Sequence, residues 1–324
     1  MLRLDGLRLV LAIVLFAGGC SYAFTSDFFG KELLAEIAIF AILAMSLDFL
    51  AGFAGMVSLG HAAFYGAGAY IYALLSIWQD WGAPMAMLAA TLFCGGAGWV
   101  IGAVTSRTQG IFFIMATLAF GQMAYVYVFE NRAIGGDDGM SGVPRLDLSG
   151  IGIDLNDPSI FACFLVVMAG LVFVLFVWLL RSGFGRALVG MHRNEARMRA
   201  LGLPLIRYKA AAFAVAGAVA GFAGTLGAQH SMFVSPDYLH WTNSGLVLVI
   251  VILGGLESLI GPALGAAVVI ALKHEISTHT EHWAFFVGLF LIVAVLAGGK
   301  GLYGLLANLR DWVAAKRRPG GGDA

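Results

Sequence analysis

Long runs of apolar residues, separated by short polar or glycine-rich stretches, dominate this chain of 324 residues. A helix needs about 20 apolar residues to cross the hydrocarbon core of a bilayer. Ten runs approach that length, and the pattern predicts helices over 7–25, 32–50, 56–76, 84–104, 111–129, 158–180, 209–229, 243–256, 261–273 and 283–299. The eighth and ninth are short and are joined by GGLESLIGP, so they form either a helical hairpin or one broken helix. The pattern therefore predicts an all-α integral membrane protein, a polytopic helical bundle of about eight to ten transmembrane helices with broken, glycine-rich segments.

Composition points the same way. Hydrophobic residues make up 60% of the chain and charged residues 12%, whereas soluble domains carry about 25% charged residues. We expect one membrane domain over residues 1–309 and a short cytoplasmic tail over 310–324, whose basic residues contact anionic membrane lipid. The formal net charge is zero, so composition predicts no attraction to nucleic acid.

The distribution of lysine and arginine predicts how the helices are oriented. If both termini are cytoplasmic, 15 of the 19 Lys and Arg residues lie in inner loops or at inner helix ends. The other four lie outside: Lys31, Arg132, Arg145 and Lys273. Because cytoplasmic loops carry an excess of basic residues, we predict both ends inside, an outer loop over 130–157 and a basic inner loop over 181–208.

Motifs for nucleotide binding and hydrolysis are missing. The sequence has no G-x-x-x-x-G-K-[ST], no G-x-S-x-G and no H-E-x-x-H, so we expect no enzyme activity and no cofactor in this chain. KHEISTHTEH, residues 273–282, gathers three histidines and two glutamates. A metal site is one interpretation of this segment, but we favour a polar outer loop without metal. Cys20, Cys94 and Cys163 have no metal-binding spacing.

One apolar stretch is unusually rich in glycine. AGFAGMVSLGHAAFYGAGAY, residues 51–70, holds five glycines, with Ser58 and His61 among them. Glycine loosens a helix, so we expect the third span to break here. A buried imidazole needs a partner, and we favour a hydrogen bond from His61 to a neighbouring helix over a contact with substrate. His61 is also the only ionisable residue close to a span interior, which argues against a proton-coupled carrier.

A second stretch matches this one at an offset of 200 residues. Five residues, Gly55, Ser58, Leu59, Ala63 and Ala67, meet identical residues at 255, 258, 259, 263 and 267. Transporters are often built from internal repeats. Small residues are common throughout this chain, so a chance match is the alternative.

The inner loop contains a compact helix signal. Asn194 suits the N-cap and Glu195 the first turn, while Gly202 suits the position just after the helix. A helix from about Glu195 to Leu201 is about two turns long and too short to persist unsupported in water. We therefore expect it to pack either on lipid headgroups or, as we favour, against another protein.

Apolar and basic residues on this short helix suggest how it would dock. Met198 and Leu201 are three positions apart, so they share a face and can serve as anchors in a groove. Arg193, Arg197 and Arg199 surround that face and can pair with acidic groups of a partner.

These motifs together resemble those of a known family. LAGFAGMVSLGHAAFYGAGAY, residues 50–70, is similar to the signature of LivM/LivH-type permeases of branched-chain amino acid ABC importers. GGDDGMSGVP, residues 135–144, resembles an outer-loop motif of the LivM branch. Residues 185–226 resemble the family's cytoplasmic coupling loop and following helix, and residues 251–266 its late glycine-rich segment. The resemblance covers nearly the whole chain.

The resemblance implies a multi-pass permease subunit of the bacterial inner membrane. Its partners would be a LivH-like permease, two ABC ATPase subunits and a periplasmic substrate-binding protein. It implies a translocation path for branched-chain or related hydrophobic amino acids, with Gly55, Ser58, Gly60 and His61 beside it. Relatives that move urea, amides or aromatic acids leave another small cargo open, and a stand-alone secondary transporter is the less favoured alternative.

For coupling to the ATPase, the resemblance implies roles for residues of the inner loop. These residues are Arg193, Glu195, Arg197, Met198, Leu201 and Gly202. Importer permeases commonly carry E-A-A-x-x-x-G here, whereas this chain has Arg197 in place of the second alanine and its glycine one position later. The departure leaves the register of docking open.

Overall fold

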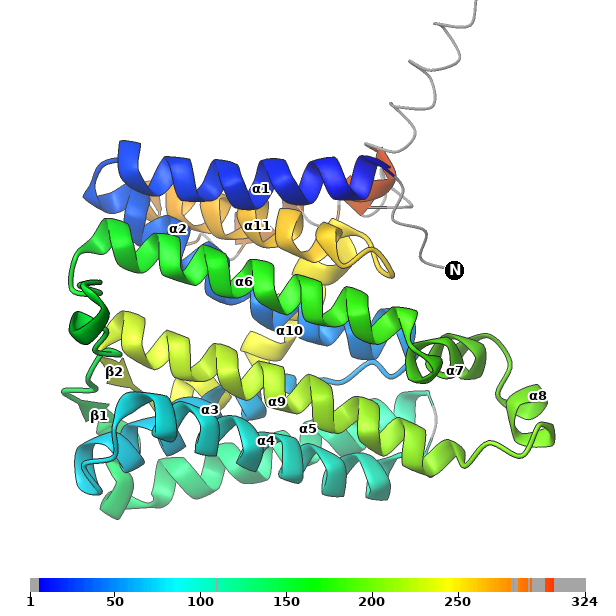
Figure 1. Cartoon of the computed structure of the whole chain (residues 1–324). Coiled ribbons are helices and arrows are strands. Elements are labelled where there is room, and N and C mark those ends of the chain that lie inside the picture. The colour runs from blue at the N-terminus through cyan, green and yellow to red at the C-terminus, as the bar shows by residue number, and fades with distance from the viewer. Residues whose placement is uncertain are drawn as a thin grey trace, which may run out of the picture.

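The computed structural model describes residues 6–108, 110–280, 282, 285–290, 292 and 301–305 of the chain. Long helices run roughly along one common axis and pack side by side (Figure 1). The tenth predicted span, 283–299, lies largely outside the described residues, and the tail over 310–324 lies wholly outside them.

The long helices of the described part follow the first nine predicted spans. They are α1 (Gly6–Thr25), α2 (Phe28–Asp48), α3 (His61–Trp78), α4 (Ala83–Thr105), α5 (Ile111–Glu130), α6 (Pro158–Arg181), α9 (Leu205–Ser231), α10 (Trp241–Gly254) and α11 (Ile260–His279). α2 continues into a π-helical turn, η1 (Phe49–Phe53). The third span begins at His61 and not at residue 56, because the chain leaves the helical path in between. The eighth and ninth predicted spans are two separate helices that pack on each other.

Several of these helices are suited to a membrane. Within the described residues, six helical segments are long and apolar enough to cross a bilayer. They are Phe28–Phe53, Ala83–Thr105, Ile111–Glu130, Pro158–Arg181, Leu205–Ser231 and Ile260–His279. The predicted fold class, a helical multi-pass membrane protein, is therefore confirmed.

The centre of the bundle is built on α2 and α9. α9 packs along α3 and α4, while α2 packs along α6 and α11. Glycine lets α3 and α9 approach closely: a β-carbon at Gly224 would overlap the carbonyl oxygen of Tyr65, and one at Gly68 would overlap that of Gly221. Such close approach is how helices gain van der Waals contact in lipid. α4 and α5 bury much less of their surface than α2 and α9, so they lie towards the edge.

A small two-stranded sheet closes one end of the bundle. β1 (Met140–Ser141) pairs antiparallel with β2 (Phe233–Val234), with Met140 opposite Val234. Four short 3-10 helices lie in the same loops: η2 (Arg132–Ile134), η3 (Gly136–Asp138), η4 (Ser149–Ile151) and η5 (Pro236–Leu239). Asp157 then starts α6, because its carboxylate accepts the amide of Ser159 at 2.7 Å, and that hydrogen bond lowers the pKa of Asp157.

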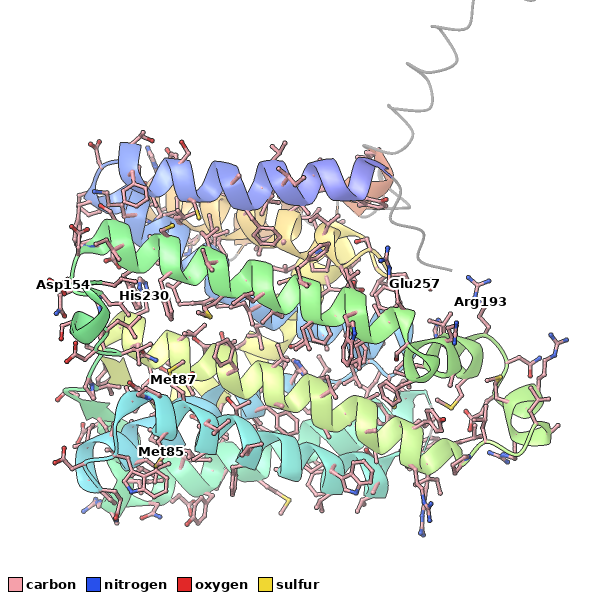
Figure 2. All side chains as sticks on the ribbon, in the orientation of Figure 1. Met85, Met87, Asp154, Arg193, His230 and Glu257 are labelled. Atoms are coloured by element: carbon pink, nitrogen blue, oxygen red, sulfur yellow. The ribbon has the colours of Figure 1, made fainter. Side chains whose placement is uncertain are left out.

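The opposite end carries two short helices, α7 (Gly183–Arg193) and α8 (Glu195–Ala200). Figure 2 places Asp154 of the loop over 130–157 at one end of the bundle and Arg193 at the other. We call the α7–α8 end the inner end and the β1–β2 end the outer end. That the inner end faces the cytoplasm stays a prediction from its basic residues.

Candidate functional site

The glycine-rich stretch forms a break between α2 and α3, which we call the first break (residues 54–60). Gly55 lies in the left-handed region, at φ +72°, which favours glycine. Gly60 ends the break immediately before α3, and a β-carbon there would overlap the carbonyl oxygen of Thr117 in α5. Steric constraints therefore favour glycine at both positions. At Gly55 the constraint is the backbone angle, and at Gly60 it is the close approach of α5.

His61, the first residue of α3, is buried in a contact between helices. Its Nε2 lies 2.7 Å from the hydroxyl of Ser46 in α2. The next amide, that of Ala62, donates to the hydroxyl of Ser244 in α10 at 2.8 Å. The start of α3 is thus fixed to two other helices through serine hydroxyls, and this geometry matches the favoured interpretation of His61 as a hydrogen-bonding residue.

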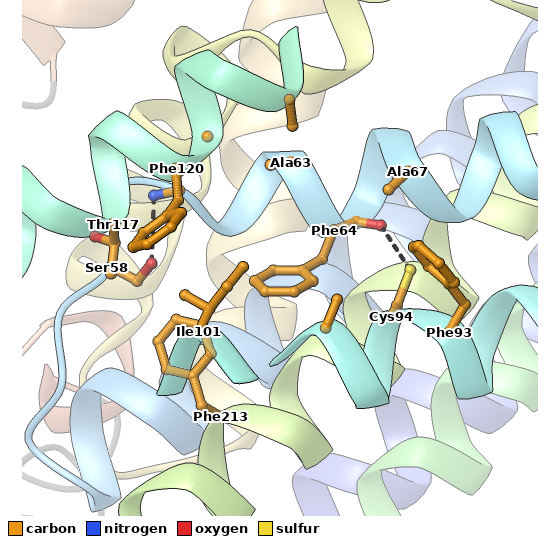
Figure 3. A pocket seen from close by; sticks show the side chains of 14 residues that line it. Ser58, Ala63, Phe64, Ala67, Phe93, Cys94, Ile101, Thr117, Phe120 and Phe213 are labelled. Carbon is orange, nitrogen blue, oxygen red and sulfur yellow. Dashed lines mark hydrogen bonds between the residues drawn. The ribbon is translucent and has the colours of Figure 1, made fainter. Parts of the chain in front are cut away.

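An apolar cavity of about 140 Å³ lies beside the first break, between α3, α4, α5 and α9 (Figure 3). Ser58 and Gly60 line its break side, and four phenylalanines line much of the rest: Phe64, Phe93, Phe120 and Phe213. Its hydroxyl groups are those of Ser58 and Thr117, and no charged side chain lines it. Two of the four predicted path residues therefore lie on this cavity, while Gly55 and His61 lie nearby but off it.

A second break, residues 255–259, separates α10 from α11. It contains three residues with positive φ: Gly255 at +106°, Glu257 at +61° and Leu259 at +59°. The buried carboxylate of Asp48, in α2, accepts the amides of Glu257 and Leu259, both at 2.9 Å. The carboxylate therefore stabilises a turn in which non-glycine residues occupy an unfavourable region.

The two breaks correspond at the offset of 200 residues seen in the sequence. Gly55 and Gly255 both have positive φ. Ser58 accepts the amide of Gly60 at 3.3 Å, and Ser258 accepts the amide of Gly261 at 2.9 Å. The likeness ends there, because the counterpart of Gly60 is Ile260 and not Gly261, and because Glu257 and Leu259 have positive φ whereas Val57 and Leu59 do not. The internal repeat therefore stays a prediction.

The inner helix α8 begins at Glu195, as the sequence predicts, and ends at Ala200, one residue before the predicted end at Leu201. The side chain of Asn194 accepts the amide of Arg197 at 2.9 Å, which makes Asn194 the N-cap. At the other end Gly202 has φ +81°, its amide donates to Arg199, and the amide of Leu203 donates to Met198. This is a Schellman ending, which satisfies carbonyls that the last helical turn leaves open.

The side chains of α8 divide between the chain itself and the surface. Glu195 accepts from Lys209 of α9 at 2.9 Å and from Arg199 at 3.3 Å, so α8 is held to α9. Met198 lies against Gly190 of α7 and is half-buried, whereas Leu201 is 71% exposed. Figure 2 shows Arg193 pointing away from the bundle, and Arg197 is exposed as well. Leu201 is therefore the apolar side chain that α8 presents outward, and Met198 supports the helix from within.

The inner loop also contacts both breaks. A β-carbon at Gly55 would overlap the imidazole of His192, the penultimate residue of α7. The Nε2 of the same imidazole lies 3.8 Å from the carboxylate of Glu257 in the second break. His192 and Asp48 were not identified as site residues from the sequence. A carboxylate inside a predicted span was a usable signal for Asp48, since such groups are costly and usually functional.

A half-polar cavity of about 240 Å³, the inner cavity, lies where these elements meet. It is lined by the first break, the turn between α4 and α5, the end of α7, Glu195 and Lys209. In the described part of the chain, no group of three or more His, Cys, Asp or Glu residues could hold a metal ion. His274 and His279 of the predicted outer loop lie in the last turns of α11.

Comparison with known proteins identifies the family. A family model described as "Branched-chain amino acid transport system / permease component" matches residues 31–296. The high-affinity branched-chain amino acid transport system permease proteins LivM of Salmonella typhimurium and Escherichia coli are both 31% identical over 286 residues, covering 82% of this chain and 67% of theirs. The probable LivM protein of Methanocaldococcus jannaschii is 24% identical over 194 residues, covering 58% of this chain and 55% of its own. No solved structure matches. Because the family model matches most of its length, this chain belongs to the permease-component family of branched-chain amino acid transport systems. It is therefore a transport subunit rather than an enzyme.

Proposed function

We propose that this chain is one of two permease subunits of an ABC importer in the bacterial inner membrane and that its cargo is a branched-chain amino acid. A LivH-like permease, two ATPase subunits and a periplasmic binding protein complete the importer. The family membership and the 31% identity to two LivM proteins support this proposal most strongly. The sequence contains no P-loop, so the energy of ATP hydrolysis must come from partner subunits.

The path for the cargo runs past the first break in this proposal. Ser58 and Gly60 line the apolar cavity, whose phenylalanine-rich wall suits a branched aliphatic side chain. Gly55 and His61 frame the same break without lining that cavity. Because Gly60 leaves no room for a β-carbon against α5, a small movement of the break changes the contact between α3 and α5.

Coupling to the ATPase uses the exposed part of α8. Leu201 is the apolar anchor, and Arg193 and Arg197 orient docking by pairing with acidic groups of the ATPase. Glu195, Met198 and Gly202 act inside the chain, where they fix the position and the ending of α8. Movement of α8 then reaches the breaks through His192.

Reconstitution tests the function. The importer of two permeases and two ATPases, in liposomes with the binding protein, should accumulate leucine when ATP is supplied on the ATPase side. Liposomes that hold this chain alone should neither hydrolyse ATP nor accumulate leucine, and an importer with ATPase subunits unable to bind ATP is the control. Accumulation driven by a proton gradient through this chain alone would contradict the proposal. Uptake of urea or an aromatic acid with no uptake of leucine would show that the cargo is that compound and not a branched-chain amino acid.

A further inference from the structure

The inner cavity contains a buried cation with spare hydrogen-bonding capacity. Lys209 is only 8% exposed, and its ammonium donates to Glu195 at 2.9 Å. An ammonium has three donors, and Glu195 is the one acceptor that the described residues supply to it. Buried donors without acceptors are costly. A group with acceptor oxygens that enters the cavity can therefore accept hydrogen bonds from Lys209.

Acceptors for a ligand's own donors lie in the same cavity. The hydroxyls of Ser106 and Thr108 line the cavity and already donate to backbone carbonyls, so they are left to act as acceptors towards a ligand. Glu195 adds a carboxylate that lines the cavity. A ligand ammonium would find here the oxygen partners that it needs.

Apart from the imidazole of His192, the remaining side chains that line the inner cavity are apolar. They are those of Ala54, Met56, Val57, Phe113, Ile114 and Met191. One cation, one anion and an apolar wall around about 240 Å³ match the three parts of a small amino acid with an aliphatic side chain. The apolar cavity beside the first break differs in this respect, because no charged side chain lines it.

We propose that the inner cavity binds a neutral aliphatic amino acid from the cytoplasmic side, with the ligand carboxylate at Lys209 and the ligand ammonium at Glu195. The proposal rests on the proposed function, which supplies the class of cargo and makes the inner end cytoplasmic. A bound amino acid competes for the ion pair that holds α8 to α9. Occupancy of the cavity therefore loosens the helix that docks the ATPase, and imported product inhibits further import.

The test uses the whole importer in liposomes with its ATPase subunits facing the bath, so that the bath is the cytoplasmic side. Labelled leucine and binding protein are placed in the lumen, and ATP hydrolysis and leucine export to the bath are measured while unlabelled L-leucine in the bath is raised. Both rates should fall to a plateau. Isopentylamine, which lacks the carboxylate, and 4-methylpentanoate, which lacks the ammonium, should each be about tenfold weaker inhibitors, since each loses a charge-assisted hydrogen bond.

Two outcomes separate this inference from the proposed function. If leucine is transported but bath leucine leaves both rates unchanged up to its solubility limit, the inner site does not exist and the function stands. If leucine is not transported at all, the proposed function fails, and the inference fails with it.

Variants locate the site in this chain. Ile114→Trp fills part of the cavity from its apolar wall, and Lys209→Met removes the cation. Each should raise the leucine concentration for half-inhibition by about tenfold. Ile111→Trp is the matched control, because Ile111 lies on the same helical turn but is 68% exposed and does not line the cavity. It should leave inhibition unchanged. Wild-type inhibition in both cavity variants would place the site elsewhere and overturn the inference.

Cysteine protection decides the matter if those variants fail to assemble. A cysteine at Val57 should react with a membrane-impermeant maleimide from the bath, and leucine should slow the reaction. A cysteine at Leu256, which is 48% exposed and lies off the cavity, should react without protection by leucine. Equal rates at Val57→Cys with and without leucine would overturn the inference.

Discussion

The two breaks share a sequence pattern but differ in what surrounds them. The second break is fixed by the buried carboxylate of Asp48, which accepts two of its amides. The first break has no such carboxylate among its described hydrogen bonds and is bordered by both the apolar cavity and the inner cavity. No residue of the second break lines either of these two cavities. The second break is therefore held by a buried carboxylate, whereas the first is held through hydroxyl groups and borders the space that a bound molecule could occupy. If one break moves during transport, we expect it to be the first.

Removing the carboxylate at the second break should have the largest effect. Asp48→Ala leaves the buried amide of Leu259 and the partly buried amide of Glu257 without acceptors, and we expect a loss of about 3 kcal/mol in unfolding free energy. Thermal unfolding of the purified chain in detergent measures it. Asp48→Asn retains one acceptor oxygen and should lie between Asp48→Ala and the wild type. An Asp48→Ala protein as stable as the wild type would show that the second break is not fixed by this group.

Overpacking the first break should affect transport more than assembly. Gly60→Leu pushes a side chain against the backbone of Thr117 and should cost about 2 kcal/mol. Gly96→Leu is the control for adding a leucine to this bundle, since Gly96 lies inside α4 and a β-carbon there meets no atom within 4 Å. Leucine uptake should fall for Gly60→Leu and stay normal for Gly96→Leu, while both pull down the ATPase subunits. Normal uptake in Gly60→Leu would make the first break ordinary helix packing.

Much of this architecture was predictable from the sequence because its causes are local. Long apolar runs predicted the nine long helices, and Asn194 and Gly202 predicted the ends of α8 through their own backbone preferences. Glycine content predicted the first break but placed it inside a span, whereas it lies between α2 and α3.

Contacts between distant segments could not be predicted in the same way. The amide of Glu257 that Asp48 accepts is 209 residues away, and only packing of α2 against the second break brings the two together. The direction in which the side chain of Met198 points also depends on a neighbouring helix. Helical spacing placed it on a face with Leu201, but the position of α7 turns Met198 inward against Gly190. Sequence spacing fixes neighbours on one helix and says nothing of which neighbouring helix covers them.

In the proposed importer, movement of the ATPase reaches the first break only if the ATPase docks at α8. Leu201→Ala removes the exposed anchor, and we expect docking to weaken by about 1–2 kcal/mol, measured as loss of ATPase subunits in a pull-down. Met198→Ala should instead lower the stability of the chain and affect docking less, because Met198 packs inside it. Equal ATPase retention and uptake in Leu201→Ala and the wild type would mean that α8 rests on lipid.

The smallest effect tests the link between the inner loop and the first break. Gly55→Ala and Gly202→Ala both place a β-carbon on a residue with positive φ, which costs about 1–2 kcal/mol in unfolding free energy. At Gly202 the β-carbon meets no atom within 4 Å, whereas at Gly55 it overlaps His192. Because the imidazole is partly exposed and can turn away, we expect Gly55→Ala to cost only about 1 kcal/mol more.

A double-mutant cycle assigns that extra cost. His192→Ala removes the overlap, so the cost of Gly55→Ala measured in the His192→Ala background should fall to that of Gly202→Ala. The effect on function is measured as the ratio of binding-protein-stimulated to basal ATP hydrolysis in the assembled importer. It should fall in Gly55→Ala, where the displaced imidazole also leaves Glu257, and remain near the wild type in Gly202→Ala. If Gly55→Ala and Gly202→Ala are equal in both measurements, His192 does not connect the inner loop to the first break, and the break must receive the movement of the ATPase through another contact.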